Sequence, residues 1–158
     1  MLKKIKPYIV SILIALGVGG LSAFFTRNNM DLYEEIITPA LAPPSQAFPV
    51  VWTILFILMG ISAAMIYTDK KASETQKISA LYTYSLSLIV NFFWSIIFFN
   101  LRAFFFAFIW LLILLLLIIS TIIKYENINK TAAYLQIPYA LWVTFAGYLT
   151  ISIWYLNR

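Results

Sequence analysis

The chain has 158 residues, of which 63% are hydrophobic and only 11% are charged, and its mean hydropathy is +0.90. Soluble domains carry about 25% charged residues, so this composition excludes a soluble globular protein and indicates an integral membrane protein. The sequence contains neither Cys nor His. This excludes disulfides, thiolate nucleophiles, imidazole bases and the usual protein ligands of haem iron or zinc.

Five apolar segments alternate with charged or proline-containing connections. A membrane-spanning helix needs about 20 apolar residues, and each segment is long enough. The expected spans are residues 8–25, 47–68, 78–99, 103–123 and 132–155. The sequence therefore predicts one all-α membrane domain over residues 1–158, a bundle of five transmembrane helices.

The charged residues indicate the orientation of this bundle. Eight lysines fall on the side of the N-terminus: Lys3, Lys4, Lys6, Lys70, Lys71, Lys77, Lys124 and Lys130. Only Arg27, Arg102 and Arg158 fall on the other side. The positive-inside rule then predicts a cytoplasmic N-terminus and accounts for the net charge of +5 without nucleic acid as a partner. Heavy use of Ile, Asn and Lys suggests a bacterial plasma membrane.

The first segment carries small residues at every fourth position, namely Ser11, Ala15, Gly19 and Ala23. Such a stripe lets another helix approach closely, and it favours a homodimer. An alternative interpretation takes residues 1–23 as a cleaved signal peptide with a basic start. A signal peptide has no need of the stripe.

The connection over residues 26–46 is the only long one, and long ordered loops are usually functional. Prolines stiffen its second half, and Asp31, Glu34 and Glu35 make it acidic. We interpret this long first extracytoplasmic loop as a lid over the mouth of the bundle. The alternative is a solvated linker.

Three of the later segments each present an aromatic face at helical spacing. The faces are Trp52, Phe56 and Met59 in the second segment, Asn91, Trp94, Ser95 and Phe98 in the third, and Trp142, Ala146 and Leu149 in the fifth. They predict either a binding pocket or ordinary core packing. The fourth segment is apolar all round and is expected to face lipid largely as scaffold.

No charged side chain lies inside any predicted span. Ion-coupled transporters and ion channels usually need one, so we expect neither, although passage of an apolar molecule stays open. Asn91 is the most polar residue near mid-membrane, and an unpaired amide there is costly. Its partner is either a neighbouring helix or a bound ligand.

Several stretches, in order along nearly the whole chain, resemble the TspO/MBR family of tryptophan-rich sensory proteins and translocator proteins, which includes the mitochondrial peripheral benzodiazepine receptor. They are Gly19-Gly20, Pro39, Ala42-Pro43-Pro44, residues 48–55 (FPVVWTIL), Met59-Gly60, residues 91–95 (NFFWS), Phe98-Phe99, residues 135–146 (LQIPYALWVTFA) and Asn157. The resemblance implies a five-helix bundle, often a homodimer, with a pocket on the side of the first long loop.

Members of this family bind porphyrins, notably protoporphyrin IX, and other hydrophobic small molecules such as benzodiazepines. Carried onto this chain, the implied ligand-binding positions are Tyr33, Pro43, Pro44, Trp52, Phe56, Asn91, Trp94, Trp142, Ala146 and Leu149. The resemblance implies no metal and no required cofactor, the porphyrin being ligand or substrate. The function expected first is that of a membrane receptor, sensor or carrier.

The alternative function is an enzyme. Some bacterial members convert protoporphyrin IX to an open-ring product in light and oxygen, with Trp implicated at positions that match Trp52 and Trp142 here. The resemblance thus implies photo-oxidative porphyrin degradation with these two residues as catalytic candidates. A third reading is a structural membrane protein whose aromatic faces only pack.

The sequence departs from the family at several positions. The family often has Trp at Leu41 and Gln46 and Asp at Trp110, so the lid offers fewer aromatic contacts and the fourth span has no acid. Near the C-terminus, Leu149, Tyr155 and Arg158 fit a loose cholesterol-contact pattern, but Tyr and Arg at the end of a span are ordinary interfacial anchors.

Overall fold

The computed structural model describes residues 2–158, and its regular elements are all helical. In chain order they are α1 (Leu2–Thr26), the 3-10 turn η1 (Arg27–Asn29), α2 (Leu32–Glu35), α3 (Ala47–Thr68), α4 (Glu74–Ser95), the π-helical turn η2 (Ile96–Asn100), α5 (Phe104–Glu126) and α6 (Lys130–Leu156). Five of these helical stretches are long and apolar enough to cross a membrane. The predicted five-helix membrane bundle is confirmed.

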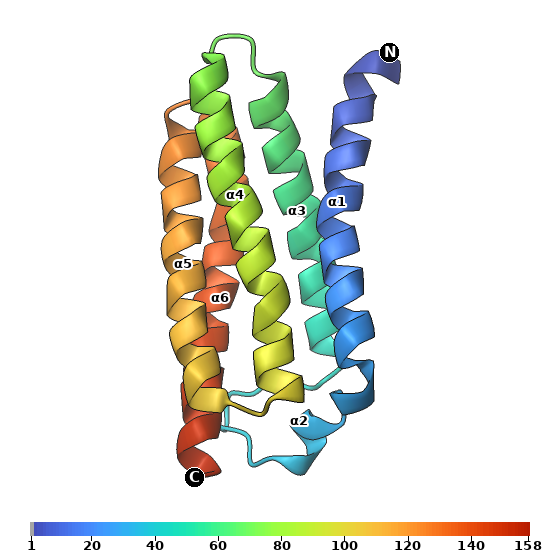
Figure 1. Cartoon of the computed structure of the whole chain (residues 1–158), viewed down its shortest axis with the longest axis vertical. Helices are drawn as coiled ribbons and strands as arrows, with labels where there is room; N and C mark the ends of the chain where they lie inside the picture. Colours follow the sequence, from blue (N-terminus) through green and yellow to red (C-terminus); the bar gives the residue numbers. More distant parts are fainter. Residues whose placement is uncertain (1) are drawn as a thin grey trace.

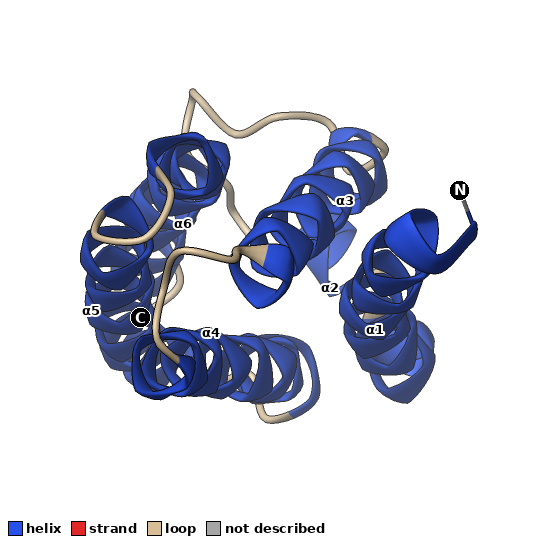
Figure 2. Cartoon of the chain, turned by 90° about the horizontal axis from the view of Figure 1, so that it is seen from above, coloured by secondary structure: helices blue, strands red, loops and turns tan. Residues whose placement is uncertain are grey.

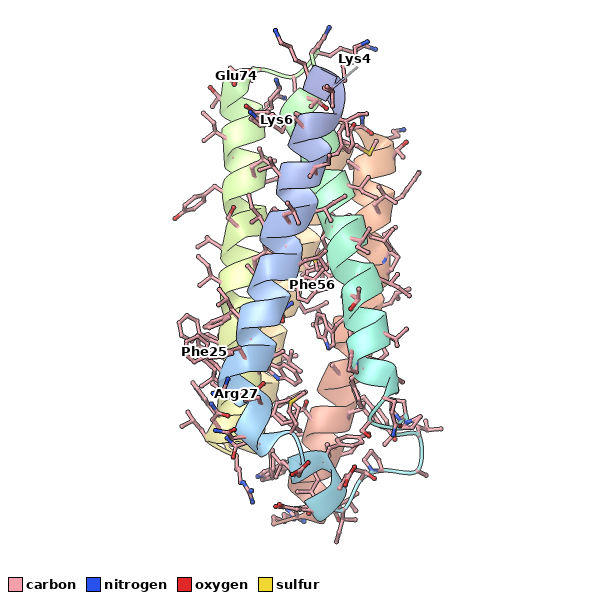
Figure 3. The ribbon with its side chains drawn as sticks, turned by 90° about the vertical axis from the view of Figure 1, so that its right-hand side faces the viewer. Lys4, Lys6, Phe25, Arg27, Phe56 and Glu74 are labelled. Atoms are coloured by element: carbon pink, nitrogen blue, oxygen red, sulfur yellow. The ribbon has the colours of Figure 1, made fainter. Side chains whose placement is uncertain are left out.

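The long helices stand side by side around a ring (Figure 2). Neighbours in the ring are α1, α3, α6, α5 and α4, and α4 closes the ring against α1. The N-terminus and the α3–α4 connection lie at one end, whereas α2 and the C-terminus lie at the other (Figure 1). We call these the amino end and the lid end, and the lid is residues 27–46. Figure 3 shows Lys4, Lys6 and Glu74 at the amino end and Arg27 at the lid end.

Helices α4 and α6 begin before the predicted apolar segments because capping hydrogen bonds, not hydropathy, set their first residues. Helix α4 begins four residues before the predicted span at a capping box, in which Ser73 accepts from the Gln76 backbone N–H and Gln76 returns the bond. Helix α6 begins where the Asn129 side chain accepts from the Ala132 N–H. Before α4, Asp69 accepts from the N–H groups of Ala72 and Lys71, and these bonds lower the pKa of its carboxyl group.

Helix α1 packs closely on α3 through small residues. Gly60 lies so near the backbone of Ile12 that an added Cβ would stand 2.5 Å from its Cα, and Gly19 lies under the ring of Phe56. Ala15 is fully buried. The small-residue stripe is therefore used within the chain, which favours α1 as a permanent member of the bundle over the signal-peptide reading. The stripe therefore gives no support to a homodimer, which stays a prediction.

Polar side chains bridge the helices in the half of the bundle nearer the amino end, which we call the packed half. Ser62 Oγ donates to the Ala132 carbonyl at 2.7 Å, and Gln136 Nε2 donates to Ser62 Oγ at 3.2 Å. Lys124 Nζ donates to Thr83 Oγ1 at 2.7 Å, joining α5 to α4. Because Ser62 and Gln136 are almost fully buried, these bonds fix the register of α3 against α6 in the bundle interior.

Helix α5 is less uniformly lipid-facing than its sequence predicts. Six of its residues are buried on one face, namely Ala107, Leu111, Leu114, Ile118, Thr121 and Tyr125, whereas α1 buries only Ala15, Ser22 and Thr26. The difference arises because α5 packs extensively against both α4 and α6, while α1 packs closely against α3 and only loosely against α4 (Figure 2).

Candidate functional site

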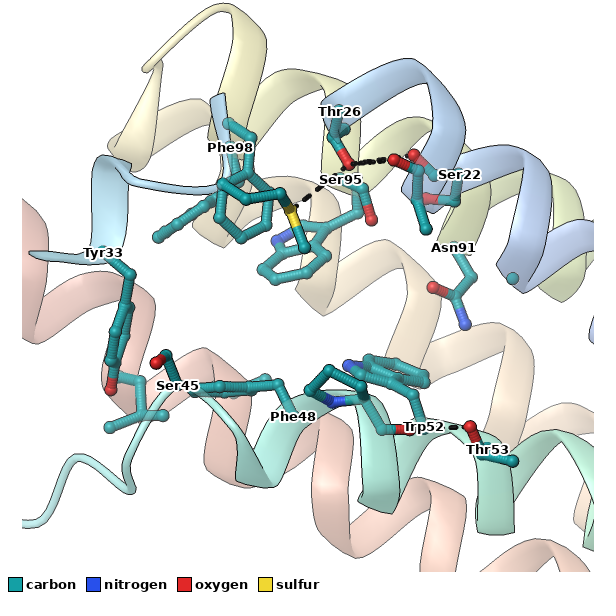
Figure 4. A pocket seen from close by; sticks show the side chains of 18 of the residues that line it. Ser22, Thr26, Tyr33, Ser45, Phe48, Trp52, Thr53, Asn91, Ser95 and Phe98 are labelled. Atoms are coloured by element: carbon teal, nitrogen blue, oxygen red, sulfur yellow. Dashed lines mark hydrogen bonds between the residues drawn. The ribbon is translucent and has the colours of Figure 1, made fainter. Parts of the chain in front are cut away.

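A cavity of about 510 Å³ occupies the other half of the bundle, between the boundary residue Asn91 and the lid. We call this the cavity half. Helices α1, α3, α4 and α6 form the walls of the cavity, and the lid covers its outer end (Figure 4). The volume falls within the range of small-molecule sites, about 300–1,000 Å³. The sequence therefore folds into a bundle with room for a compact organic ligand.

Two stacked aromatic pairs line opposite walls of this cavity. Trp52 and Phe56 of α3 stack with their ring centroids 5.6 Å apart. Trp94 of α4 and Phe98 of the following turn η2 stack with their ring centroids 5.3 Å apart. Figure 4 shows Trp52 and Phe98 on facing sides of the space. Each pair follows i, i+4 spacing, which puts both rings on one side of the helix. The walls thus offer flat aromatic surface to a flat apolar ligand.

Asn91 lies at the inner end of the cavity and is only 4% exposed. Its Nδ2 donates to the Tyr139 hydroxyl of α6 at 2.9 Å. This bond supplies the interhelical partner that the sequence requires, and it leaves the amide oxygen beside the cavity (Figure 4). A bond from Asn91 to a ligand stays a prediction.

The lid is an ordered structure rather than a free linker. The Tyr33 hydroxyl donates to the Pro43 carbonyl at 3.0 Å, joining the two halves of the lid. Asn157, just after α6, accepts from the Ile37 N–H and donates to the Ile37 carbonyl, both at 2.9 Å. These contacts bring Tyr33 to the cavity, where partial burial raises the pKa of its hydroxyl.

Two further contacts tie the lid to the connection between α4 and α5. Asn29 Nδ2 donates to Asn100 Oδ1 at 2.8 Å, and Arg102 pairs with Glu35 at 3.1 Å. Arg102 has a positive φ of 51°, a backbone conformation that non-glycine residues rarely adopt. The π-helical turn η2 and the residues just after it therefore supply two of the contacts that hold the lid.

Most of the site residues implied by the family resemblance meet at the cavity. Its lining includes Tyr33, Trp52, Phe56, Asn91, Trp94, Ala146 and Leu149. Pro43 and Pro44 are not among the lining residues. The Pro43 carbonyl accepts a hydrogen bond from the Tyr33 hydroxyl, and the Pro44 carbonyl accepts one from the Ala47 N–H at the start of α3. Trp142 is also not among the lining residues. Its ring lies edge-on to that of Trp52, with the ring centroids 6.5 Å apart.

Several lining residues were not predicted. They come from α1, the lid and the first turn of α3, and include Gly19, Gly20, Ser22, Ala23, Thr26, Asp31, Glu34 and Phe48. Ser22 and Thr26 do stand one turn apart in an apolar segment, which is a usable signal for a face turned inward. The position of the two acidic residues depends on the fold of the lid, for which the sequence pattern gives no guide.

The chain is similar to known membrane proteins over nearly its whole length. The sequence model of the TspO/MBR family matches residues 10–156. The "Tryptophan-rich protein TspO" of Chlorobaculum tepidum is 32% identical over 99% of both chains. "Protein CrtK" of Rhodobacter capsulatus is 32% identical over 79% of this chain and 78% of its own length, and the bovine "Translocator protein" is 28% identical over 89% and 83%.

Proposed function

Because the chain belongs to the TspO/MBR family, we propose that it is a membrane receptor, sensor or carrier that binds protoporphyrin IX or a similar flat hydrophobic molecule. The observation that carries this proposal is the pair of aromatic stacks facing each other across a cavity of about 510 Å³. The ligand lies between the wall of α3 and the wall of α4, beneath the lid.

The proposed ligand is bound by burial of its apolar surface and by stacking of its flat ring on the aromatic side chains of the cavity. Burial of apolar surface contributes about 25 cal/mol per Å², and a well-placed aromatic pair adds about 0.5–1.5 kcal/mol. Trp52 and Trp94 each present such a surface from a rigid helix. Binding of this kind needs no metal and no further cofactor.

The test uses the purified protein in lipid vesicles and protoporphyrin IX as the probe. Its absorbance is followed against protein concentration in darkness, with empty vesicles and free tryptophan as controls. A shifted, saturable band is expected. Absence of any saturable shift beyond empty vesicles would contradict porphyrin binding and leave the fold untouched.

A second candidate function is light-dependent oxidation of the bound porphyrin. The observation that favours it is a pair of neighbouring oxidisable side chains at the cavity. Trp52 lines the cavity, and the ring of Trp142 lies edge-on to it with the ring centroids 6.5 Å apart. The bound ring would supply the photochemistry and oxygen the oxidant. An indole would pass one electron to the excited ring, the ring would pass it to oxygen as superoxide, and the indole radical would then regain an electron from the ring, so that the ring is oxidised and the indole restored.

This second function predicts a new long-wavelength product that forms only in light. Trp52→Phe and Trp142→Phe should each suppress the product while the dark absorbance shift persists. Product formation at the same rate in these variants, or in empty vesicles with free tryptophan, would leave binding as the function.

We also propose a homodimer, on the strength of the family resemblance. Because Ala15 and Gly19 pack inside the chain, the interface must use another surface. Cross-linking in bilayers at low protein-to-lipid ratio should trap a dimer, and recovery of monomer alone would contradict it.

A further inference from the structure

One side of α3 is buried against α1 near the middle of the bundle and exposed nearer the lid. Counted from the lid end, Pro49, Thr53, Phe56 and Gly60 follow i, i+4, i+7, i+11 spacing, so they share this side. Gly60 and Phe56 are buried against α1. Thr53 and Pro49 are exposed. The two helices therefore diverge between Phe56 and the lid, as Figure 3 shows.

The cavity reaches the surface of the bundle where these helices diverge. Thr53 and Pro49 line the cavity although they are exposed, and so do Gly20 and Ala23 of α1. Residues that line a cavity and are also exposed lie where the cavity opens. These four residues therefore form the edges of an opening between α1 and α3, which we call the side opening.

The side opening lies among residues that face lipid. Large apolar side chains flank its edges, each more than half exposed, namely Leu21 and Phe24 on α1 and Val50 and Ile54 on α3. Both helices are apolar enough to cross a membrane, and neither carries a charged side chain at this level. The opening therefore faces the acyl chains of the bilayer.

The edges of the side opening present few unpaired polar groups. Thr53 Oγ1 donates to the Pro49 carbonyl at 2.7 Å, and Pro49 has no backbone N–H. Gly20 and Ala23 have no polar side-chain atoms, and their backbone lies inside α1. Because loss of a hydrogen-bond partner in an apolar medium is costly, such edges suit the passage of an apolar molecule.

The other boundaries of the cavity are held by specific contacts. Between α1 and α4, the rings of Phe25 and Phe92 meet edge-on with their centroids 5.9 Å apart, and Asn100 Nδ2 donates to the Phe25 carbonyl at 3.0 Å. Asn157 ties the lid to α6 through two hydrogen bonds to Ile37. Among residues 2–158, no hydrogen bond or aromatic pair joins α1 to α3. At the level of the cavity, a ligand can thus pass between α1 and α3 without breaking such a contact.

We propose that the flat apolar ligand enters and leaves the cavity from the bilayer through the side opening, while the lid stays tied to α6. The inference rests on the proposed function and adds the route by which its ligand arrives. A flat apolar molecule concentrates in the bilayer rather than in water, so this route starts where the ligand already is. Small residues at Gly20 and Ala23 keep the route free, since nothing lies within 4 Å of a Cβ added at Gly20.

The test measures rates of binding and release, because a route affects both. Protoporphyrin IX is mixed in a stopped-flow instrument, in dim light, with the protein in phosphatidylcholine vesicles. Trp52 and Trp94 line the cavity, so quenching of tryptophan fluorescence follows association, and insertion into empty vesicles is measured separately. An excess of empty vesicles then withdraws the probe, and recovery of the fluorescence gives the release rate.

The decisive variant is Gly20→Leu, which places a side chain in the side opening where open space receives it. We expect association and release each to slow at least about tenfold, the effect of about 1.4 kcal/mol on a barrier. Ala23→Leu, on the same edge, should also slow both rates. The matched control is Gly17→Leu, since Gly17 is exposed with open space around it but does not line the cavity. It should keep the wild-type rates.

A further variant tests the lid as the competing route. Asn157→Ala removes both hydrogen bonds between the lid and α6. Entry through the side opening predicts that neither rate rises in this variant. Faster exchange in Asn157→Ala together with wild-type rates in Gly20→Leu would assign entry to the lid and overturn the inference.

The remaining outcomes separate the inference from the proposed function. Faster release with unchanged association in both leucine variants would mean that leucine occupies the binding space rather than the route, and would overturn the inference. Saturable binding with wild-type rates in both leucine variants would overturn it as well and leave porphyrin binding intact. No saturable quenching in the wild type beyond empty vesicles would overturn the proposed function, and the inference with it.

Discussion

The two halves of the bundle fill their interiors in different ways. In the packed half, small and polar side chains such as Ser62 and Gln136 join helices through buried hydrogen bonds. In the cavity half, aromatic rings such as Trp52 and Trp94 line a space that they do not fill. The packed half therefore determines how the helices fit together, whereas the aromatic side chains of the cavity half remain available to contact a ligand.

Helix α4 runs through both halves and shows the change along one inward face. Ser87 is buried in the packed half, and Asn91 bonds to Tyr139 at the boundary. Trp94 of α4 and Phe98 of η2, which continues α4, line the cavity. These positions follow i, i+4, i+7, i+11 spacing, so they lie on one side of the helix. This division predicts that substitutions in the packed half change stability and that substitutions in the cavity half change binding.

The largest expected loss of stability follows from a single added methyl group where α1 meets α3. In Gly60→Ala the new Cβ would lie 2.5 Å from Ile12 Cα, a backbone atom that cannot move alone. Overpacking of this kind costs about 1–3 kcal/mol, and we expect the upper end of that range. The free energy of unfolding is measured by SDS titration in mixed micelles.

The control for this substitution is Gly17→Ala on α1, where nothing lies within 4 Å of an added Cβ. That variant should be as stable as the wild type or slightly more stable, because Ala favours a helix by about 1 kcal/mol over Gly. Equal stability of the two variants would show that α1 can shift on α3, and that the close contact does not define the fold.

A smaller loss is expected when one partner is removed from the buried polar pair. Ser62→Ala deletes both of its hydrogen bonds and leaves the buried amide of Gln136 without a partner, which costs about 1–3 kcal/mol. Adding Gln136→Met should recover part of the loss, because replacing both partners is less costly than replacing one.

The matched control is Ser85→Ala, since Ser85 is exposed and donates only to Leu81 within its own helix. It should leave the free energy of unfolding within about 0.5 kcal/mol of the wild type. A double variant that is less stable than Ser62→Ala alone would show that Gln136 has a role beyond this pair.

In the cavity half, added side-chain volume should lower ligand affinity rather than stability. Ala146→Phe adds a ring to the α6 wall of the cavity, so affinity for the porphyrin probe should fall at least about tenfold, which is about 1.4 kcal/mol. Stability should change less than in Gly60→Ala, because the ring enters existing space. Leu141→Phe, on the exposed side of α6, should alter neither quantity.

Undiminished binding in Ala146→Phe would place the ligand elsewhere. A loss of stability as large as that of Gly60→Ala would show that the cavity half is as tightly packed as the packed half, so that the two halves do not differ in the way described.

The sequence predicts the helices better than it predicts their faces. The span at residues 47–68 coincides with α3, because a continuous apolar run with a proline near its start and a charge after its end leaves little choice. Helix α1 starts at Leu2 rather than at residue 8, since lysines are good helix formers although they lower the hydropathy.

Contacts that depend on how helices rotate against one another could not be predicted. The stripe with Ala15 and Gly19 indicates a close helix neighbour, but the pattern alone does not tell α3 of the same chain from a second copy. Likewise, the helix Leu32–Glu35 is too short to show a period, so the place of Asp31 and Glu34 at the cavity mouth had no signal in the sequence.

The smallest effect is expected at the connection between α3 and α4, where Asp69 accepts from the N–H groups of Ala72 and Lys71. These bonds hold the pKa of the Asp69 carboxyl group below its usual range. A lowered folded-state pKa stabilises the protein above the unfolded pKa of about 4, and the contribution is lost as pH falls through the folded value. Because Asp69 is only partly buried, solvent screens its charge and the contribution is small.

Asp69→Asn keeps an acceptor oxygen but not the charge, so it isolates this contribution. The stability difference between wild type and Asp69→Asn should be constant from about pH 7 to 5 and should shrink below about pH 4. Thermal unfolding followed by circular dichroism at a series of pH values measures it. A difference that instead grows below pH 4 would mean that the charge opposes the turn, and that the packed half closes its amino end without help from this carboxylate.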